Sequence, residues 1–449
     1  MASRNSNRWL VGLVAGLTFG SLPAQTPAPA PLRLTLADAV RLASGEVPVV
    51  ALATLRDAEA DARVRQARAA LLPSLSLGGA WMNRTFNSQS LGITFPPNAP
   101  FQFPLLIGPF NNYDARLNAS QTLFDWSSAA RVRAARTQAD GSRAERGVTV
   151  EASALSAATA YLRAARAQAV VAARQADSAI AAELVGLALA QKTAGVSAAI
   201  DVTRARTQLV TAEGLLLVAR NQLDRGRIDV TRALGIDPAT PLVLTDTLAA
   251  TLGVADVPAQ PDSAVAAALA NRPELRAELA RAGAARQTGA AIRAERLPRL
   301  VVAGDYGVNG LTVPGAIATR DLTLAVSVPI LDGFRREARL AEQDAVVRES
   351  EVRERDLRQQ IAADVDGALL DLRSAQAQQV VAAERLRLAD DELAQSRERF
   401  KAGVVGNIEV IDAQTNLIRA RDSDIDARFA GATARLSLAR AAGVARTLH

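Results

Sequence analysis

The stretch KAGVVGNIEV, residues 401–410, interrupts a long segment that otherwise has the composition of continuous helix. It contains two glycines, and Gly403 can adopt the left-handed conformation that ends a helix. A second stretch, KTAGVSAAIDV at residues 192–202, has a similar arrangement of small residues around Gly195. We therefore expect each stretch to be the tip of a helical hairpin, where the chain reverses and returns antiparallel.

The two turns belong to an internal repeat. Residues 38–75 align without gaps with residues 263–300, and Gly195-Val196 takes the place of Gly403-Val404. Self-similarity over such a length means that one structural unit is used twice. The sequence predicts a first repeat at 36–235 with its helical hairpin at 127–235, a linking segment at 236–261, and a second repeat at 262–443 with its hairpin at 334–442.

Within each repeat the hydrophobic period changes after a Leu-Pro pair. Helical pattern covers residues 36–70 and 262–296, and Pro73 or Pro298 then disfavours further helix. Beyond these prolines apolar and polar residues alternate, as in strands that have two different faces. The alternation predicts two strands in each repeat, at about 74–84 and 113–124 in the first and about 299–309 and 321–331 in the second.

More than half of the aromatic residues lie between Trp81 and Trp126. Aromatic side chains gather at the two interfaces of membrane β-barrels, and about ten residues suffice for a tilted strand to cross a bilayer. An aromatic core in a soluble β-domain is the alternative. Because only closed barrels pair every strand backbone group in lipid, and four strands cannot enclose an interior, several chains would have to share one barrel.

Two segments, 127–192 and 334–401, contain no proline, and each would form a helix about 100 Å long at about 1.5 Å per residue. In the second segment a seven-residue series is occupied by Val365, Leu372, Leu386, Leu393 and Phe400, with Gln379 as its one polar member. This spacing predicts a coiled-coil seam.

Composition excludes several classes of function. The chain has no cysteine, and its one histidine is His449, so disulfides, thiol chemistry and histidine metal sites are not expected. The net charge is +6, and charges alternate along helical segments instead of forming runs, so no nucleic-acid partner is expected. Phosphate-binding glycine loops and nucleophile elbows are absent from the sequence. We therefore expect neither an enzyme nor a cofactor.

Residues 1–24 have the parts of a secretory signal peptide: a start with Arg4 and Arg8, an apolar core at 10–19, and small residues before the cleavage site. Residues 25–35 would then form a flexible leader. No later apolar run is long enough for a transmembrane helix. The mature chain is expected to leave the cytoplasm.

In the order of these features the chain resembles the TolC-like outer-membrane efflux proteins, also called outer membrane factors. The resemblance covers about residues 34–443 and rests on the double repeat and the Leu-Pro exits into strands. It rests also on the sequences LFD at 123–125 and LDG at 331–333, which lead into long helices, and on IEVIDAQT at 408–415. It implies long helical hairpins in a coiled-coil α-barrel, with four strands per chain in a twelve-stranded β-barrel shared by a trimer.

The resemblance also implies a location and partners. A homotrimer would sit in outer-membrane lipid with its helical tunnel in the periplasm, where it would bind a periplasmic adaptor (membrane fusion) protein and an inner-membrane pump of RND or ABC type. It would be the channel-tunnel of a tripartite efflux system for small molecules. The outer-membrane component of a type I protein secretion system is an open alternative. A periplasmic coiled-coil scaffold would explain the helices but not the alternating strands.

Members of this family place acidic side chains where the tunnel closes near the tips. The matching positions are Glu409 and Asp412, and Asp201 matches Glu409 in the first hairpin. Residues three apart share a helix face, so three chains would present rings of carboxylates that favour cations. Arg204 stands where Asp412 lies, so the two hairpins are not equivalent. An ordinary solvated helix face is the alternative interpretation.

The turn residues are the expected adaptor contacts: Gly195, Val196, Gly403, Val404, Val405, Gly406 and Asn407. Plain turn chemistry is the alternative explanation for them. The resemblance implies that a tyrosine and an arginine lock the closed tip in the best-known member, and Phe400 and Val405 stand at those positions here. Either apolar packing around Phe400 closes the tip, or the resting tip is looser.

Overall fold

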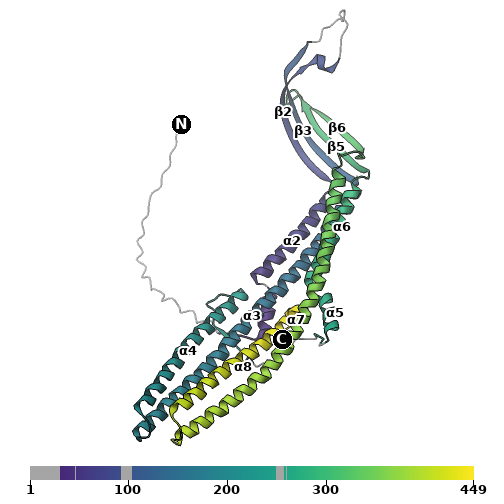
Figure 1. Ribbon diagram of the computed structural model, residues 1–449. Helices are drawn as coiled ribbons and strands as arrows, with labels where there is room; N and C mark the ends of the chain where they lie inside the picture. The colour runs from purple at the N-terminus through teal and green to yellow at the C-terminus, as the bar shows by residue number, and fades with distance from the viewer. Residues whose placement is uncertain (1–30, 46, 93–103, 249–256, 259, 449) are drawn as a thin grey trace, which may run out of the picture.

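The computed structural model describes residues 31–45, 47–92, 104–248, 257–258 and 260–448. The expected signal peptide at 1–24 lies outside them. The molecule is elongated, with a β-sheet at one end and the tips of two helical hairpins at the other (Figure 1). Shorter helices and the C-terminus lie at the level between them, which we call the waist.

The hairpins form one helical layer. The first pairs α3 (Trp126–Thr193) with α4 (Ala199–Ala233), and the second pairs α7 (Arg335–Lys401) with α8 (Asn407–Ala441). Helix α3 contacts α8, so the order across the layer is α4, α3, α8 and α7 (Figure 1). Asp125 caps α3 by accepting a hydrogen bond from the Ser127 N–H at 2.9 Å.

The helical segments expected at 36–70 and 262–296 are present, but each consists of two helices, which corrects the prediction of one helix in each repeat. The first consists of α1 (Leu36–Ala43) and α2 (Pro48–Ala69), and the second of α5 (Pro261–Asn271) and α6 (Pro273–Ala294). In both repeats the second helix begins at a proline, which lacks an N–H and disfavours helix in the residue before it.

The sheet has the order β2-β3-β5-β6 and is antiparallel throughout. Its strands are β2 (Ser74–Asn87), β3 (Leu106–Phe124), β5 (Arg299–Gly310) and β6 (Ile317–Ser327), and a short 3-10 helix, η1 (Ser88–Leu91), follows β2. The predicted bounds of three strands were wrong. The first two extend toward the loop that joins them, and β6 ends before Pro329, since proline cannot donate to a ladder.

The two faces of the sheet differ in chemistry. Leu77 lies opposite Leu117, which lies opposite Tyr306, so these three share one face. That face carries exposed apolar side chains: Leu75, Leu77, Trp81, Leu117, Tyr306, Leu322, Leu324 and Val326. The other face is polar: Ser76, Asn112, Asp114, Arg116, Asn118, Asp305, Asn309, Asp321 and Thr323.

A second, two-stranded sheet lies at the waist. β1 (Leu32–Leu34) pairs in parallel with β4 (Leu242–Leu244), so residues 32–34 of the expected flexible leader are ordered, and that part of the prediction was wrong. The Tyr161 hydroxyl donates to the Leu34 carbonyl at 3.0 Å. Burial is the main cause that raises the pKa of Tyr161, which keeps the phenol protonated as a donor. The C-terminal 3-10 helix η2 (Ala445–Thr447) packs beside this core.

Candidate pore constriction and tip contacts

The two hairpin turns close in the same way. The Val196 N–H donates to the Gln191 carbonyl at 3.0 Å, and the Val404 N–H donates to the Arg399 carbonyl at 3.0 Å. Gly195 and Gly403 have φ of 73° and 70°, a region that costs little for glycine alone. These are the hydrogen bonds of Schellman motifs, so the sequence ends each helix where the resemblance requires a tip.

Five of the expected adaptor contacts are exposed at this end of the molecule: Gly195, Val196, Gly403, Val404 and Gly406. We call these residues the tip surface. The two turns lie side by side, because a Cβ added at Gly403 would stand 3.7 Å from Cγ1 of Val196. The tip surface is therefore shared by both hairpins and is small and apolar.

Phe400 does not belong to the tip surface. It is 2% exposed and packs in a cluster with residues of all four hairpin helices, and Val405 lies partly buried against that cluster. The cluster consists of Leu184, Ala188, Val202, Ala205, Ala389, Leu393, Phe400, Val410, Ala413, Leu417 and Ala420. The Phe400 carbonyl also accepts a hydrogen bond from the Gln191 side chain at 2.6 Å. In this structure apolar packing and an amide-to-backbone hydrogen bond join the hairpins around Phe400.

Asn407 differs from the other expected contacts because its side chain is fully buried. Its Nδ2 donates to the Asp201 carbonyl at 2.8 Å, which ties the start of α8 to the start of α4. A direct contact with a partner would require the side chain to become exposed. Gln191 and Gln414 make similar amide-to-carbonyl bonds between the hairpins. Sequence analysis missed them, since polar amides in long helices give no signal of burial.

Two of the three expected constriction carboxylates, Asp201 and Glu409, lie in the first turns of α4 and α8. Glu409 accepts from Arg399 Nη1 at 2.7 Å, and Asp412 is exposed one turn further along α8. Asp201 accepts from the Ser197 hydroxyl at 2.8 Å and has Arg204 at 3.6 Å. A solvent-exposed ion pair contributes only about 0–1 kcal/mol, so Arg399 leaves the Glu409 carboxylate free to reorient. The single chain brings these groups to one end of the molecule without joining them into one cluster.

The sheet carries the features expected at a membrane. Trp81 lies opposite Tyr113 toward the far end of β2, and Phe124 meets Trp126 edge to face at 5.4 Å where β3 passes into α3. Between these aromatic pairs lies the apolar face described above. On the polar face Arg116 donates to Asp114 at 2.8 Å and to Asp305 at 2.6 Å. The arrangement fits a strand unit with a lipid side and a water side.

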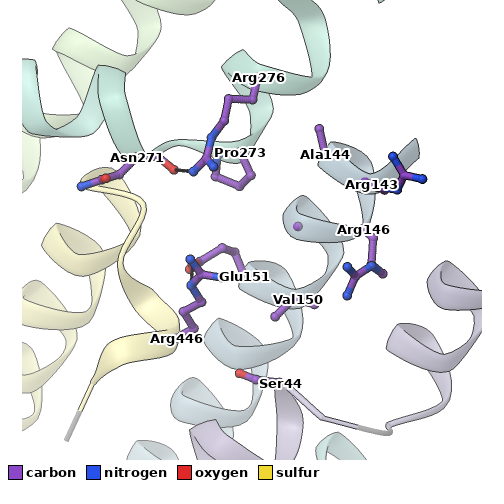
Figure 2. Close-up of a pocket in the computed structure, with 11 residues that line it drawn as sticks. Ser44, Arg143, Ala144, Arg146, Val150, Glu151, Asn271, Pro273, Arg276 and Arg446 are labelled. Carbon is purple, nitrogen blue, oxygen red and sulfur yellow. Dashed lines mark hydrogen bonds and ion pairs between the residues drawn. The ribbon is translucent and has the colours of Figure 1, made fainter. Parts of the chain in front are cut away.

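A cavity of about 570 Å³ with charged side chains in its wall lies at the waist (Figure 2). Four arginines line it: Arg143, Arg146, Arg276 and Arg446. Three of them already have carboxylate partners, Asp61 for Arg143, Asp57 for Arg146 and Glu151 for Arg446. Burial raises the pKa of Glu151, and Arg446 opposes that effect. The paired charges tie α2 and η2 to α3, so we assign the cavity a structural role.

Within the described residues, no group of three or more side chains is arranged to hold a metal ion. None of the helices in the same part of the chain combines the length and the apolarity needed to cross a membrane.

Comparison with known proteins supplies the family. The family described as "Outer membrane efflux protein" matches residues 40–236 and 264–444, the two halves of the repeat. Protein CyaE of Bordetella pertussis is 26% identical over 427 residues, which are 94% of this chain and 87% of CyaE.

Solved structures show the same fold. The CmeC outer membrane channel of Campylobacter jejuni superposes with a TM-score of 0.77 at 15% identity, over 99% of this chain and 94% of CmeC. The outer membrane protein VceC of Vibrio cholerae superposes with a TM-score of 0.74 at 19% identity, over 91% of this chain and 96% of VceC. The resemblance stated from the sequence is thereby confirmed. The chain belongs to the outer membrane efflux protein family, and it is a non-enzymatic channel protein of the outer membrane with its helical tunnel in the periplasm.

Proposed function

We propose that three copies of this chain form one duct, which passes small molecules from a periplasmic adaptor and an inner-membrane pump to the exterior. The observation that carries the proposal is the sheet. It has one apolar face, one polar face and, within the described residues, no strand beside β2 or β6 at its two edges.

Such a sheet is incomplete alone. Leu77 is 80% exposed and Leu322 81% exposed, which suits contact with lipid better than contact with water. Backbone groups at the edges must be paired inside a membrane. The strands alternate in direction, so β6 of one copy can pair antiparallel with β2 of the next. Two copies would give an eight-stranded barrel filled by side chains, whereas three would leave a passage lined by the polar face.

The helical layer supports the same assembly. Its outer helices, α4 and α7, both expose apolar side chains: Val210, Leu215, Leu217 and Val218 on α4, and Leu370, Val380, Val381 and Leu388 on α7. A groove of about 660 Å³ runs beside Val380, Val381 and Leu388. Helix α4 of a neighbouring copy would cover it. A single rotation axis relating the copies would thus pair the edge strands of the sheet and also cover the outer helices of the helical layer.

At the tips, three copies would bring Glu409 and Asp412 into two rings of carboxylates around the axis, with Asp201 nearby on the first hairpin. Concentrated negative charge in a narrow passage attracts cations and repels anions. The exposed tip surface would receive the adaptor, because a small apolar surface with rigid glycine turns suits the close approach of another helical tip.

The test is the native mass of the protein extracted from outer membranes in detergent, with partners identified by cross-linking before extraction. We expect three chains per particle and an adaptor among the cross-linked proteins. A particle of one chain that stays soluble without detergent would refute the proposal. Recovery of an ABC exporter with a secreted polypeptide would assign the duct to type I protein secretion instead.

Adjacent residues of β6 give a matched pair of variants. Leu322→Arg places a charge on the apolar face, at a cost of roughly 2–4 kcal/mol near the middle of a bilayer. Thr323→Arg places the same charge on the polar face. We expect trimers in the outer membrane to be lost in the first and retained in the second. Equal yields would show that the apolar face does not meet lipid.

A further inference from the structure

One charged side chain lies on the apolar face of the sheet. In β6 this face carries Leu322, Leu324 and Val326, and Arg320 has the same alternation. Arg320 is exposed, and its Cα partner in β5 is Tyr306, which belongs to the apolar face. Within the described strands the other charged residues alternate with the polar face: Arg84, Asp114, Arg116, Arg299, Asp305 and Asp321.

The sheet offers Arg320 no counter-charge. Among the described residues its side chain has no hydrogen bond and no ion pair. Strand β2, which would lie beside β6 in the proposed trimer, contains no acidic residue, and neither does the turn at 311–316. An unpaired arginine on a lipid-facing strand is unfavourable, and least so near the membrane surface. A favourable partner for Arg320 must therefore come from outside the chain.

Arg320 lies in the outer half of the sheet. It is three residues from the start of β6 at Ile317, the end away from the helices, and seven residues from Ser327 (Figure 1). The Trp81–Tyr113 pair lies four residues further out than the row that contains Arg320, about 13 Å at about 3.3 Å per residue. The long side chain of an arginine can reach the headgroups from this depth while its stem stays among apolar groups.

A hollow of about 480 Å³ continues inward from Arg320 along the apolar face. Tyr306 lies beside Arg320 at the outer end of the hollow, and Val302 lines it further in. Between them Ala119 is the Cα partner of Gly304, and these two small residues leave the space open. The hollow thus has a cation and a hydroxyl group outside and an apolar floor inside. A membrane lipid has its phosphate and its acyl chains in the same order.

We propose that Arg320, together with the Tyr306 hydroxyl, binds the phosphate of an anionic lipid in the outer leaflet, and that an acyl chain of this lipid lies in the hollow over Gly304. The inference rests on the proposed function, since it takes the apolar face to meet lipid. A guanidinium group matches the geometry of phosphate oxygens. Each trimer would hold three such lipids, close to the edges where β6 of one copy pairs with β2 of the next.

The test measures lipid binding to purified trimers in detergent by native mass spectrometry. The probes are dioleoyl phosphatidic acid, whose phosphate is a monoester, and dioleoyl phosphatidylcholine, which has the same chains but a choline on the phosphate. Arg320→Gln removes the charge from the apolar face, and Arg320→Lys keeps a charge there. Arg84→Gln is the matched control, because it removes an exposed arginine of β2 from the polar face.

We expect the wild-type trimer to prefer phosphatidic acid. Arg320→Gln should weaken binding of this lipid by at least about fivefold, the contribution of one basic residue near an anionic membrane surface. Arg320→Lys should retain most of the affinity, and Arg84→Gln should change it by no more than about twofold. Trimer yield is measured first. If Arg320→Gln lowers the yield, Tyr306→Phe decides, with an expected loss of affinity of about twofold or more from one missing hydrogen bond.

Equal affinity of the wild-type trimer for the two lipids would overturn the lipid site, and so would unchanged binding of phosphatidic acid in the deciding variant. Displacement of the lipid by millimolar inorganic phosphate would assign the site to free phosphate and would also overturn it. A wild-type protein that forms no trimer would refute the proposed function, and this inference with it.

Discussion

The two hairpin turns have the same backbone conformation but differ in the side chains around them. Gly195 and Gly403 have nearly the same φ, 73° and 70°, and close the same hydrogen bonds. Lys192 occupies the place of Phe400 in the repeat, and it is exposed where Phe400 is buried. The repeat therefore specifies two equal turns, and the side chains decide that the second turn packs into the first hairpin.

This difference separates turn formation from packing between the hairpins. Turn formation depends on glycines that both copies have. Among the turn residues, Phe400 and Asn407 of the second turn are the buried side chains that contact the first hairpin. Variants at matching positions of the two turns can therefore distinguish the two roles.

The largest effect is expected at Phe400. Truncating a buried phenylalanine to alanine costs about 3–5 kcal/mol, because packing is lost and a cavity remains. Phe400→Ala with Val405→Ala should therefore loosen the contact between the two hairpins at the tip and raise the entry of vancomycin-sized solutes into cells. Lys192→Ala with Ser197→Ala, at the matching positions of the first turn, should leave entry unchanged. Unchanged permeability in the Phe400 variant would count against a gate at this level.

A smaller effect is expected at Asn407. Asn407→Ala leaves the Asp201 carbonyl without its side-chain donor and should cost about 1–3 kcal/mol. Hydrogen exchange of the first turn of α4 should become faster, since that turn loses its tie to α8. The reverse change in the first turn, Ala199→Asn, adds an exposed amide and should alter exchange by no more than about twofold. Equal exchange in both variants would mean that the bond does not hold the hairpins together.

Substitution of the turn glycine should destabilise the protein equally in the two turns. This tests the backbone conformation that the turns have in common. Gly195→Ala and Gly403→Ala each force a Cβ into the left-handed region, at a cost of roughly 1–2 kcal/mol. Thermal unfolding of purified protein should show similar losses for both. A much larger loss for Gly403→Ala would show that contact with Val196 also matters, because that side chain lies 3.7 Å from the added Cβ.

Features of the fold that depend on local pattern could be predicted from the sequence. The alternation of apolar and polar residues predicted the strands, and the proline-free segments predicted the long helices. Gly195 and Gly403 predicted the turns. Strand ends and helix breaks were less accurate, since Pro48 and Pro273 stand in segments that otherwise keep a helical period. Pairing of Leu32–Leu34 with Leu242–Leu244 could not be predicted, because two short apolar stretches far apart in sequence carry no information about contact.

The candidate site was predictable only in part, for a related reason. The repeat located the tips, but burial of Asn407 depends on how one hairpin packs against the other. Asp177 is buried and accepts hydrogen bonds from Arg174 and from Arg421 of α8. These partners could not be identified in a chain with 46 acidic and 52 basic residues, where acid and base at helical spacing are common. Only the packing of α3 against α8 distinguishes this buried network from solvated pairs such as Arg387 with Glu384.

The smallest effect on stability is expected at the tip carboxylates. Their substitution should instead change the ion preference of the proposed channel. Glu409→Gln breaks an ion pair with Arg399 in which the arginine is 56% exposed and the glutamate 34%, so stability should fall by less than about 1 kcal/mol. Three copies of Glu409→Gln with Asp412→Asn would nevertheless remove the charge of both proposed rings. Reversal potentials in a salt gradient should then show a loss of preference for cations. Asp201→Asn should change the preference less, because the Asp201 side chain is only 16% exposed and the Ser197 hydroxyl already occupies it. An equal shift in both variants would place Asp201 in the narrowest part of the passage, and no shift in either would move the constriction away from the tips.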